Sequence, residues 1–485
     1  MKNLLTLFLI LSPLFLISQT QIGSDLDGVA AEDYFGNSVS LSSDGNVIAI
    51  GAKYNDTNGS NSGHVRIFRN NNGVWEQIGN SINGENLDDW SGYSISLSSN
   101  GSIIAIGAHN NDGNGQDSGH VRIFRNNNGV WEQIGTDIDG EAAGDYSSHS
   151  ISLSSDGSVV AIGAEGNDGN GQDSGHVRVF HNNNGVWEQI GLDIDGEAAG
   201  DQFGISISLS SNGNIIAIGA SFNNEGYVQI FRNNNGVWEQ IGSDIEGEAG
   251  GDQFGSSISL SNDGNIVAIG ARHNDGNGTS SGHVRVFRNN NGVWEQIGTD
   301  IDGEAAGDQS GYSVSLSSNG NTITIGAPRN QEKGNRSGHV RIYKNNKGIW
   351  NQFGIDIDPE AAGDFSGSSI SLSSNGSVVA IGAIKNNGNG NSSGHVRVYD
   401  LSTVLKTTDF LISKFSIFPN PVKNSFTIKL KENIELKKIN IYNSLGKFIK
   451  SSKKLKTDTS TFVKGIYIIE IETNKGKASK KLVIE

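Results

Sequence analysis

The sequence predicts an all-β protein in which a seven-bladed β-propeller of four-stranded blades precedes a small C-terminal β-sandwich. The first observation is a repeat, because a Gln-Ile-Gly or Gln-Phe-Gly triplet occurs seven times at steps of 56 residues, with one step of 51. The second is composition: 66 of the 485 residues are glycine and only 18% are charged, which suits turn-rich β structure. Repeated units of this size bury their apolar faces against their neighbours.

Each repeat contains four candidate strands, which are clearest in the third copy. Residues 150–153 alternate serine with apolar side chains, residues 158–164 form a nearly continuous apolar run, and further candidates follow at 176–180 and 186–190. Alternation is typical of a strand with one face of small side chains, whereas a continuous run indicates a strand covered on both faces. Gly- and Asn-rich turns join the strands in pairs. We therefore expect antiparallel meanders with the second strand at the centre of the packing.

The number of strands of each kind indicates a closed ring. The Gly-Ala pair that ends the second strand occurs seven times, but the fourth strand with its tryptophan occurs six times. After residues 396–399 the chain leaves the pattern, while its first region begins with an orphan triplet at Gln21. We predict that this first segment supplies the outer strand of the last blade and so removes the exposed sheet edges. An open solenoid is less favoured, because neither end has the altered composition of a capping repeat.

Residues 1–20 have the pattern of a secretory signal peptide. Lys2 precedes the apolar run 4–17, and small or polar residues follow at 18–20. The run is too short and too weakly flanked for a membrane anchor, and the alternative is a buried strand or helix. No later stretch is apolar enough to span a bilayer. We therefore expect an exported chain with no transmembrane segment after removal of the signal.

Charge and cysteine content limit the function classes. Residues 21–401 contain 18 basic and 45 acidic residues, whereas residues 402–485 contain 17 lysines and 7 acidic residues. An acidic repeat region repels nucleic-acid phosphates and attracts cations, so we expect no nucleic-acid partner. The chain has no cysteine, which excludes disulfide frameworks and thiolate metal sites.

Short motifs flank the first two strands of several repeats. Phe-Gly precedes the first strand at Phe35, Phe203 and Phe254, and Gly-Ala-Pro follows the second strand at Gly326. Over residues 21–401 the chain thereby resembles the FG-GAP repeats of integrin α-chain propellers and related bacterial surface proteins, which implies a β-propeller. That family often carries a DxDxDG calcium loop between strands one and two. This chain has only Ser-Ser-Asp-Gly there, so the resemblance does not extend to that calcium site.

Residues 415–485 are expected to form a second, smaller domain after a linker at 402–414. Five strands are predicted, at 426–430, 438–442, 447–450, 465–471 and 480–484. The landmarks in order are Phe418-Pro419-Asn420-Pro421, Ile441-Tyr442-Asn443 with Gly446-Lys447, Lys464-Gly465-Ile466-Tyr467 and a basic last strand. They resemble the type A sorting domain of type IX secretion, which implies that the type IX machinery exports the protein through the periplasm to the cell surface or medium. An ordinary β-sandwich binding domain is the alternative.

Strand parity places the two long loops of every repeat on one face of the ring, where ligand contacts are expected. One of these loops reads Asp-Ile-Asp-Gly-Glu-Ala-Ala-Gly-Asp in the third copy. Asp137, Asp139, Glu141 and Asp145 are weak candidates for a Ca²⁺ site, since this cation prefers clustered oxygen ligands. An aspartate that caps a turn would repeat equally well. We expect no other cofactor.

Histidine begins the third strand in six of the seven copies. Because each lies on a different blade, about two strand spacings out from the inner strand, the six side chains cannot share one metal ion. We expect them to make structural hydrogen bonds instead. These residues are His64, His120, His176, His283, His339 and His395.

Positions that differ between copies are candidates for a ligand site. Three such positions lie at the long-loop face: the residue that opens strand one, the residue three before it, and the residue after Gly-Ala. In copies one to three they include a set of aromatic and histidine side chains, namely Tyr34, Trp90, Tyr93, His109, Tyr146 and His149. We predict that these form an aromatic platform of the kind on which sugars and peptides stack. The alternative is sequence drift at exposed positions that no ligand touches.

The favoured function is a non-enzymatic secreted or cell-surface protein, of adhesive type, that recognises a glycan or a protein through its long-loop face. An extracellular polysaccharide hydrolase or lyase, with its site at the channel mouth near His149, His109 and Glu165, is the alternative. A structural spacer without a ligand is a third possibility. The sequence contains no nucleophile elbow, HExxH helix, P-loop or Rossmann fingerprint, so no catalytic residue is predicted.

Overall fold

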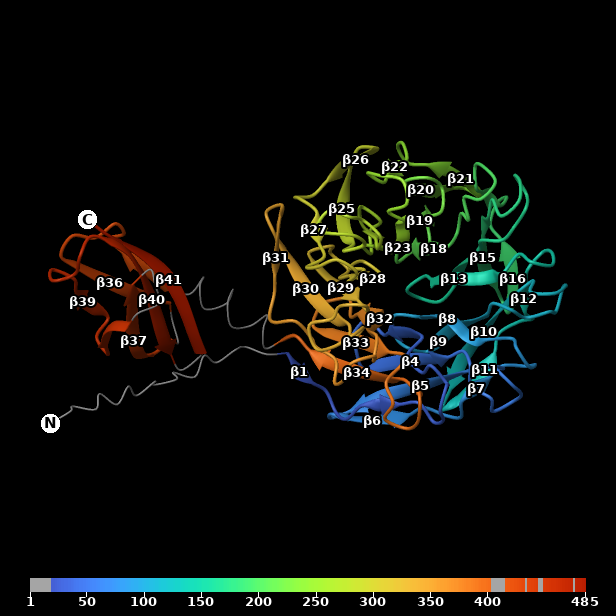
Figure 1. The fold of residues 1–485 in the computed structure, drawn as a ribbon, viewed down its shortest axis with the longest axis horizontal. Coiled ribbons are helices and arrows are strands. Elements are labelled where there is room, and N and C mark those ends of the chain that lie inside the picture. The colour runs from blue at the N-terminus through green and yellow to red at the C-terminus, as the bar shows by residue number, and fades with distance from the viewer. Residues whose placement is uncertain (1–18, 403–414, 432–433, 444–447, 474–475) are drawn as a thin grey trace. The chain divides into compact units, whose positions relative to one another are not determined.

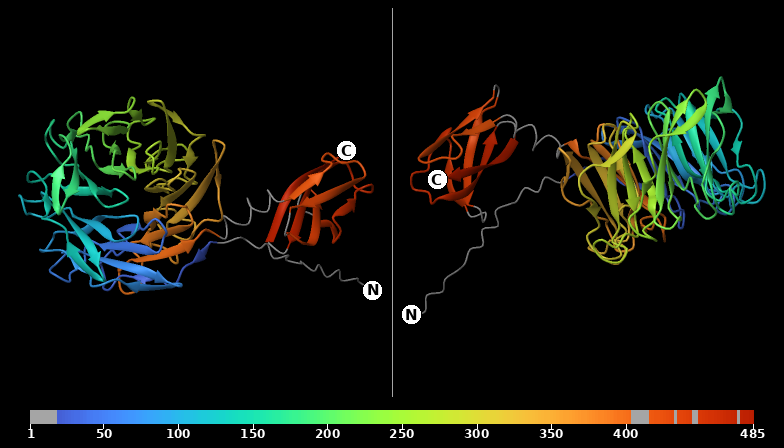
Figure 2. Two further views of the ribbon diagram at one scale, coloured as in Figure 1. Left: turned by 180° about the vertical axis from the view of Figure 1, so that it is seen from behind. Right: turned by 90° about the horizontal axis from the view of Figure 1, so that it is seen from above.

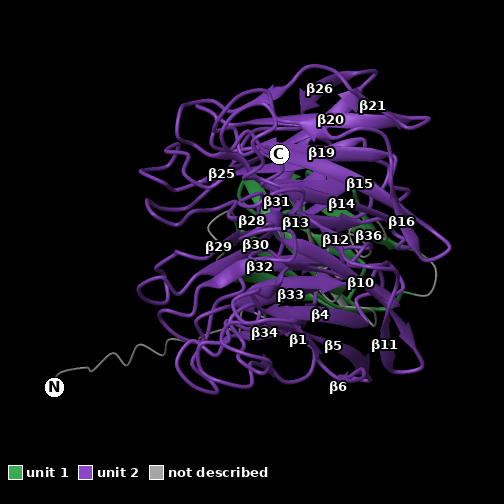
Figure 3. Cartoon of the chain, turned by 90° about the vertical axis from the view of Figure 1, so that its right-hand side faces the viewer, with its two compact units in different colours: residues 1–18, 401–485 green, residues 19–400 purple. Residues whose placement is uncertain are grey.

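The computed structural model describes residues 19–402 and 415–485, apart from 432–433, 444–447 and 474–475. The chain divides into two compact units, residues 19–400 and the C-terminal region from Leu401, which Figure 3 colours separately. Most of the predicted signal peptide and linker lies outside the described residues. The first unit begins at Gln19, two residues before the predicted start. Among the described residues, no helix has the length and apolarity needed to span a membrane.

Seven antiparallel sheets surround a central axis in the first unit, and each sheet is one blade (Figures 1 and 2). The inner strands are β3 (Ser38–Leu41), β8 (Ser91–Leu97), β13 (Ser147–Leu153), β18 (Ser206–Leu209), β23 (Phe254–Leu260), β28 (Ser313–Leu316) and β32 (Ser366–Leu372). The second strands are β4 (Val47–Ala52), β9 (Ile103–Ala108), β14 (Val159–Ala164), β19 (Ile215–Ala220), β24 (Ile266–Ala271), β29 (Thr322–Ala327) and β33 (Val378–Ala383).

Two further strands complete each blade. The third strands are β5 (His64–Asn71), β10 (His120–Asn127), β15 (His176–Asn183), β20 (Tyr227–Asn234), β25 (His283–Asn290), β30 (His339–Asn346) and β34 (His395–Asp400). The outer strands are β6 (Val74–Gln77), β11 (Val130–Gln133), β16 (Val186–Gln189), β21 (Val237–Gln240), β26 (Val293–Gln296), β31 (Ile349–Gln352) and, for the last blade, β1 (Thr20–Gln21).

Six blades carry an additional two-residue strand that the sequence did not predict. It pairs with the first residues of the third strand, beside the outer strand. These short strands are β2 (Leu26–Asp27), β7 (Ile82–Asn83), β12 (Ile138–Asp139), β17 (Ile194–Asp195), β22 (Ile245–Glu246) and β27 (Ile301–Asp302).

The second strand of each blade is buried because its side chains alternate between the two seams that flank the blade. In β4 all six residues are buried. Val47 and Ala49 pack with β9 of the next blade, whereas Ile48 and Ile50 pack with β34 of the preceding one. A single blade therefore cannot bury its own apolar side chains, and the hydrophobic core consists of the seams.

The ring closes through the first segment of the chain, as predicted. β1 and β2 pair with β34, placing Gln21 opposite Tyr399 and Leu26 opposite Val396, and the inner strands β32 and β3 are in contact. Near the axis, a serine hydroxyl donates a hydrogen bond of 2.6–2.8 Å to a backbone carbonyl of the next blade at all seven seams. The alternating serines of strand one thus join the blades.

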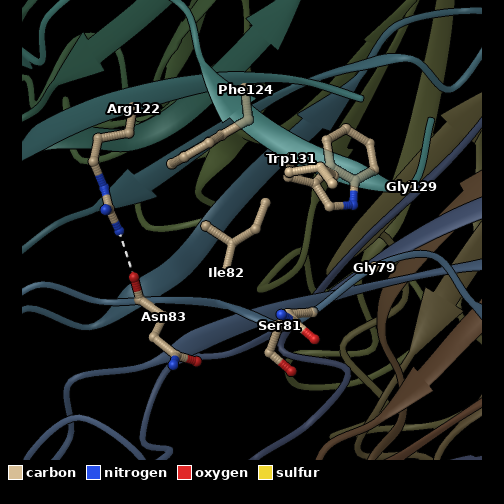
Figure 4. Close-up of a pocket in the computed structure, with 10 residues that line it drawn as sticks. Gly79, Ser81, Ile82, Asn83, Arg122, Phe124, Gly129 and Trp131 are labelled. Carbon is tan, nitrogen blue, oxygen red and sulfur yellow. Dashed lines mark hydrogen bonds between the residues drawn. The ribbon is translucent and has the colours of Figure 1, made fainter. Parts of the chain in front are cut away.

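Further contacts join the outer parts of neighbouring blades, and Figure 4 shows the side chains of Trp131 and Arg122 at the seam of the first two blades, with the Arg122–Asn83 hydrogen bond dashed. Trp131 Nε1 donates to the carbonyl of Ile78 at 2.9 Å, and Arg122 donates to the carbonyl of Asn83 at 2.7 Å. The tryptophan bond recurs at six seams. At the seventh seam Gln19 occupies the tryptophan position in the register and donates to Ile355 at 2.7 Å. We interpret the hollow in Figure 4 as part of this repeating seam.

The C-terminal unit is a β-sandwich. One sheet has the order β35 (Phe415–Phe418), β36 (Ser425–Leu430), β39 (Lys456–Asp458). The other has the order β38 (Phe448–Ser452), β37 (Leu436–Asn443), β40 (Gly465–Thr473), β41 (Gly476–Ile484). Both sheets contribute to one apolar core. The five predicted strands are present. The prediction missed β35 and β39; the three residues of β39, Lys-Thr-Asp, carry no apolar alternation.

The Phe-Pro-Asn-Pro motif of this unit has a structural explanation. Asn420 Oδ1 accepts a hydrogen bond from the Val483 N–H at 2.9 Å, and Asn420 Nδ2 donates to the Lys481 carbonyl at 2.8 Å. The asparagine side chain thus pairs with β41, while the flanking prolines have no N–H to leave unpaired. The motif ties the start of the unit to its last strand.

Candidate functional site

One rim position repeats in all seven blades with a left-handed backbone conformation. It lies three residues before the position that was predicted to open strand one, although Tyr93 and His149 lie two residues inside β8 and β13. Its φ is between 51° and 56° at Tyr34, Trp90, Tyr146, Gln202, Gln253, Gln309 and Phe365. This conformation is uncommon for residues other than glycine. At Trp90 it is held because the N–H donates to Asn61 of the preceding blade at 3.2 Å and the carbonyl accepts from Tyr93 at 3.0 Å. The scaffold therefore presents different side chains from equivalent backbones.

On the first three blades the side chains of this rim form a continuous aromatic cluster, which we call the aromatic arc. Its members are Tyr34, Tyr54, Trp90, Tyr93, His109, Tyr146 and His149. The His109 ring stacks on Tyr93, with centroids 4.4 Å apart and planes 10° apart, and on Tyr146 at 4.9 Å and 21°. Trp90 stacks beside Tyr93 at 6.3 Å. The structure thus brings together residues of neighbouring blades that the sequence nominated.

Tyr34 joins the arc only through Tyr54, which the sequence analysis missed. The Tyr54 ring lies edge-on to Tyr34 at 5.0 Å and to Trp90 at 5.1 Å. Tyr54 is the second residue after Gly-Ala, one place beyond the variable position that was considered. That second position also differs between copies, so the same comparison of repeats would have found it.

Two lysines accompany the rings. Lys53 Nζ lies 4.7 Å from the centroid of Tyr93 and 5.3 Å from that of Trp90, within the range of a cation–π contact. Burial lowers the pKa of Lys53 to about 8. Lys385 Nζ lies 4.9 Å from the ring of Phe365 and 6.0 Å from that of Tyr34. Because the last blade adjoins the first, Phe365 and Lys385 extend the arc beyond its predicted end.

His109, His149 and Glu165 meet at the inner side of the arc. His109 and Glu165 directly follow β9 and β14, whereas His149 lies on β13 at a β-bulge between Ser147 and Ser150, a feature that redirects side chains. His149 Nδ1 lies 2.7 Å from Glu165 Oε1. Each of the three side chains places one potential ligand atom within 4.8 Å of the others.

Burial dominates the electrostatics of this region. It lowers the pKa of His109 to about 2, with the charges of His149 and Lys53 acting in the same direction, so the imidazole is neutral with a free lone pair. Burial also raises the pKa of Tyr93, and the charge of Glu165 adds to this. The Tyr93 phenol therefore remains protonated at neutral pH.

The four weak calcium candidates do not converge on one point. Asp145 Oδ2 accepts hydrogen bonds of 3.1 and 2.9 Å from two backbone N–H groups of its own loop, as a turn cap does. Asp137 accepts a bond of 2.6 Å from a glutamine side chain, and Glu141 forms an ion pair with Arg178 at 3.5 Å. Asp139 lies in β12, where its carbonyl accepts a bond of 2.5 Å from Arg178.

The six histidines that begin third strands are buried and separate from one another. Nδ1 of five of them lies 3.6–3.9 Å from carboxylates, while Nε2 of all six has no hydrogen-bond partner in the described part of the chain. The structural hydrogen bonds that were predicted for these six histidines are therefore not made by their Nε2 atoms among the described residues. In the shorter blade, Tyr227 replaces histidine and donates to Asp201 at 2.9 Å. Burial lowers the pKa of His64 to about 4.

Comparisons with known families agree with both resemblances found in the sequence. Residues 26–68 and 246–287 match the FG-GAP repeat, and residues 416–485 match the secretion system C-terminal sorting domain. The recognition of FG-GAP repeats followed by a type IX sorting domain is confirmed. The chain is thus a secreted or cell-surface protein whose tail interacts with the secretion machinery. No significant match was found among curated proteins.

The chain is also similar to two solved structures. Hydrazine synthase of Kuenenia stuttgartiensis is 12% identical, with a TM-score of 0.49, over 75% of this chain and 94% of that chain. The periplasmic gluconolactonase of Pseudomonas aeruginosa is 14% identical, with a TM-score of 0.47, over 67% of this chain and 85% of that chain. Likenesses at this level do not extend an activity to this chain.

Proposed function

We propose that this protein is a non-enzymatic binding module, displayed on the cell surface or released, whose aromatic arc takes an extracellular glycan or protein ligand. The observation that supports this proposal is the continuity of the arc over adjacent blades of a scaffold whose backbone is otherwise repeated. Stacked rings with polar ends offer apolar faces to a sugar ring or a peptide and hydrogen bonds to its edges. A rigid scaffold makes such contacts without a large cost in entropy.

The lysines of the arc favour a ligand that carries negative charge. Residues 21–401 contain only five lysines, and two of them, Lys53 and Lys385, lie against rings of the arc or its extension. A positive site on an acidic protein attracts an anionic group locally. Among glycans, an acidic polysaccharide therefore fits the arc best.

One contact favours the alternative of polysaccharide cleavage, because His149 and Glu165 lie 2.7 Å apart and such a pair can move a proton. Glycoside hydrolysis, however, generally uses two carboxylates on opposite sides of the scissile bond. In the described part of the chain, the ion pairs made by side chains of the arc involve one carboxylate, that of Glu165. Binding without turnover is therefore the better proposal.

Binding of the exported chain to glycan and matrix-protein arrays, with and without Ca²⁺, tests this proposal. We expect Trp90→Ala to lower affinity by roughly 30-fold, since an aromatic hot spot contributes about 2 kcal/mol. Gln202→Ala, at the equivalent rim position of the fourth blade, is the matched control and should leave affinity unchanged. Equal affinity for the wild type and Trp90→Ala would contradict the proposal. Turnover of a bound polysaccharide that His149→Ala abolishes would establish the enzymatic alternative instead.

A further inference from the structure

His109, His149 and Glu165 form a donor set whose nitrogen and oxygen atoms are not used by the ring stacking of the arc. Two imidazoles and one carboxylate place ligand atoms within 4.8 Å of one another, and they come from two neighbouring blades. The equivalent positions in the other repeats hold different residues. The group is therefore a local feature and not a consequence of the repeat.

One polar atom of each side chain in this group lacks a hydrogen-bond partner among the described residues. The His109 side chain is buried, with 7% of its surface exposed, and its Nδ1 has no partner among the described residues. His149 Nδ1 and Glu165 Oε2 also make no hydrogen bond there, although His149 Nδ1 lies 2.7 Å from Glu165 Oε1. That close approach consequently lacks the angles of a hydrogen bond. A buried polar atom without a partner costs about 1–3 kcal/mol, so three of them together indicate a ligand.

Three of the repeated clusters of histidine and carboxylate elsewhere in the ring differ from this group. In each of the three, an arginine of the third strand pairs with a glutamate: Arg122 with Glu85 at 3.4 Å, Arg178 with Glu141 at 3.5 Å and Arg341 with Glu304 at 3.4 Å. Glu165 forms no ion pair with lysine or arginine among the residues that the structure describes. Its negative charge is consequently available to an external cation.

We propose that His109, His149 and Glu165 bind one divalent transition-metal ion, with zinc as the best fit. Two histidines and a carboxylate are a ligand set that suits zinc, whereas calcium and magnesium prefer oxygen ligands alone. Tetrahedral ligands about 2.1 Å from zinc lie about 3.4 Å apart, so small side-chain rotations would bring the three groups into place. The side chains of His149 and Glu165 are 20% and 16% exposed, which leaves a fourth position open to solvent.

This site is independent of whether the arc binds a glycan. The open fourth coordination position of the ion would face solvent beside the stacked rings and would accept an oxygen of a carboxylate or hydroxyl group. The aromatic arc could equally well bind a ligand without any metal. The two proposals therefore fail separately.

Titration of the metal-free exported chain with Co²⁺, followed by visible absorption, tests the metal site without any ligand of the arc. We expect the wild type to bind one equivalent with the intense visible bands of low-coordinate cobalt, and Zn²⁺ to displace it. Loss of a direct ligand should weaken binding by more than the roughly 100-fold that outer partners contribute. His149→Ala and the near-isosteric Glu165→Gln should both show this loss.

His176→Ala is the matched control, because His176 lies in one of the repeated clusters, with Glu141 and Asp193. It should bind Co²⁺ as the wild type does. Thermal unfolding adds a second readout, in which Zn²⁺ raises the Tm of the wild type and of His176→Ala but not of Glu165→Gln. Failure of the wild type to bind an equivalent, or wild-type affinity in both ligand variants, would overturn the proposal. So would loss of binding in His176→Ala.

Discussion

Two arcs of the same rim, on blades one to three and on blades four to six, differ in side chains but not in backbone. Trp90 and Gln309 both have a φ of 56°. Each donates its N–H to the preceding blade, at 3.2 and 3.1 Å, and accepts a bond from the residue three positions later. Gln309 is buried and lies 3.4 Å from His273 Nδ1, whereas Trp90 is half-buried among rings. The repeat therefore fixes the backbone position from which each rim side chain extends. The identity of the side chains at a few positions then determines what one arc of the rim can bind.

Replacement of aromatic residues of the arc by the glutamine found on blades four to six should have the largest effect on ligand affinity. The double variant Trp90→Gln/Tyr146→Gln copies the residue found on blades four to six and keeps the backbone conformation. Two aromatic hot spots contribute about 4 kcal/mol together, so we expect a loss of affinity of roughly 1,000-fold. Array binding and titration calorimetry measure this loss, and circular dichroism checks the fold. Retained affinity would show that the ligand uses another surface.

The buried histidines of third strands should make the propeller sensitive to acid. His64 has a pKa of about 4 in the folded protein, mainly because of burial, against about 6.5 in an unfolded chain. Between these values the unfolded state binds more protons. Stability is therefore complete above pH 6.5 and falls as the pH decreases towards 4, by about 3 kcal/mol for this group.

The blade with Tyr227 suggests the variant that tests this prediction. His64→Tyr should reduce the loss of stability between pH 7 and pH 4, measured as the urea midpoint at each pH. His181→Gln is the control, because it replaces a histidine of a third strand whose side chain is 43% exposed and not buried. An unchanged acid response in His64→Tyr would mean that carboxylates, and not this histidine, govern acid unfolding.

Substitution by glycine at the shared rim position should have the smallest effect. The change in stability should be positive on blades four to six and negative on the aromatic arc. Both Gln202 and Trp90 adopt the left-handed conformation, which costs about 1 kcal/mol for a residue with a Cβ. Gln202→Gly should therefore stabilise the protein by up to about 1 kcal/mol. Trp90→Gly relieves the same strain but loses its ring contacts with Tyr54 and Tyr93, so it should be destabilising. The urea midpoint of each variant is compared with that of the wild type. Shifts in the same direction for both variants would contradict this account.

Much of the propeller was predictable because its signals are local and repeated. The alternation of serine and the continuous apolar run identified the first two strands, and the structure places them as β13 at Ser147–Leu153 and β14 at Val159–Ala164. Closure followed from a count of strands. The two-residue strands were missed because they carry no periodicity, and β39 was missed for the same reason.

The candidate site was only partly predictable. Comparison of copies nominated six residues that lie in one cluster, but it omitted Tyr54, which connects Tyr34 to Trp90. The oxygen-rich loop suggested calcium, whereas the structure directs Asp145 to its own turn and Glu141 to Arg178. Loop composition cannot show where a carboxylate points, because the direction depends on the turn and on the neighbouring blade.

The sequence by itself determined the blade pattern, the closure of the ring and the sorting domain, because strand periodicity, repeat spacing and ordered motifs are properties of the linear chain. Only the tertiary structure decided which variable side chains touch. Phe365 is linked to the arc through Lys385 because the last blade adjoins the first. His149 faces Glu165 because a β-bulge redirects it. Such contacts join residues on different strands and blades, so their geometry depends on packing and cannot be read from spacing alone.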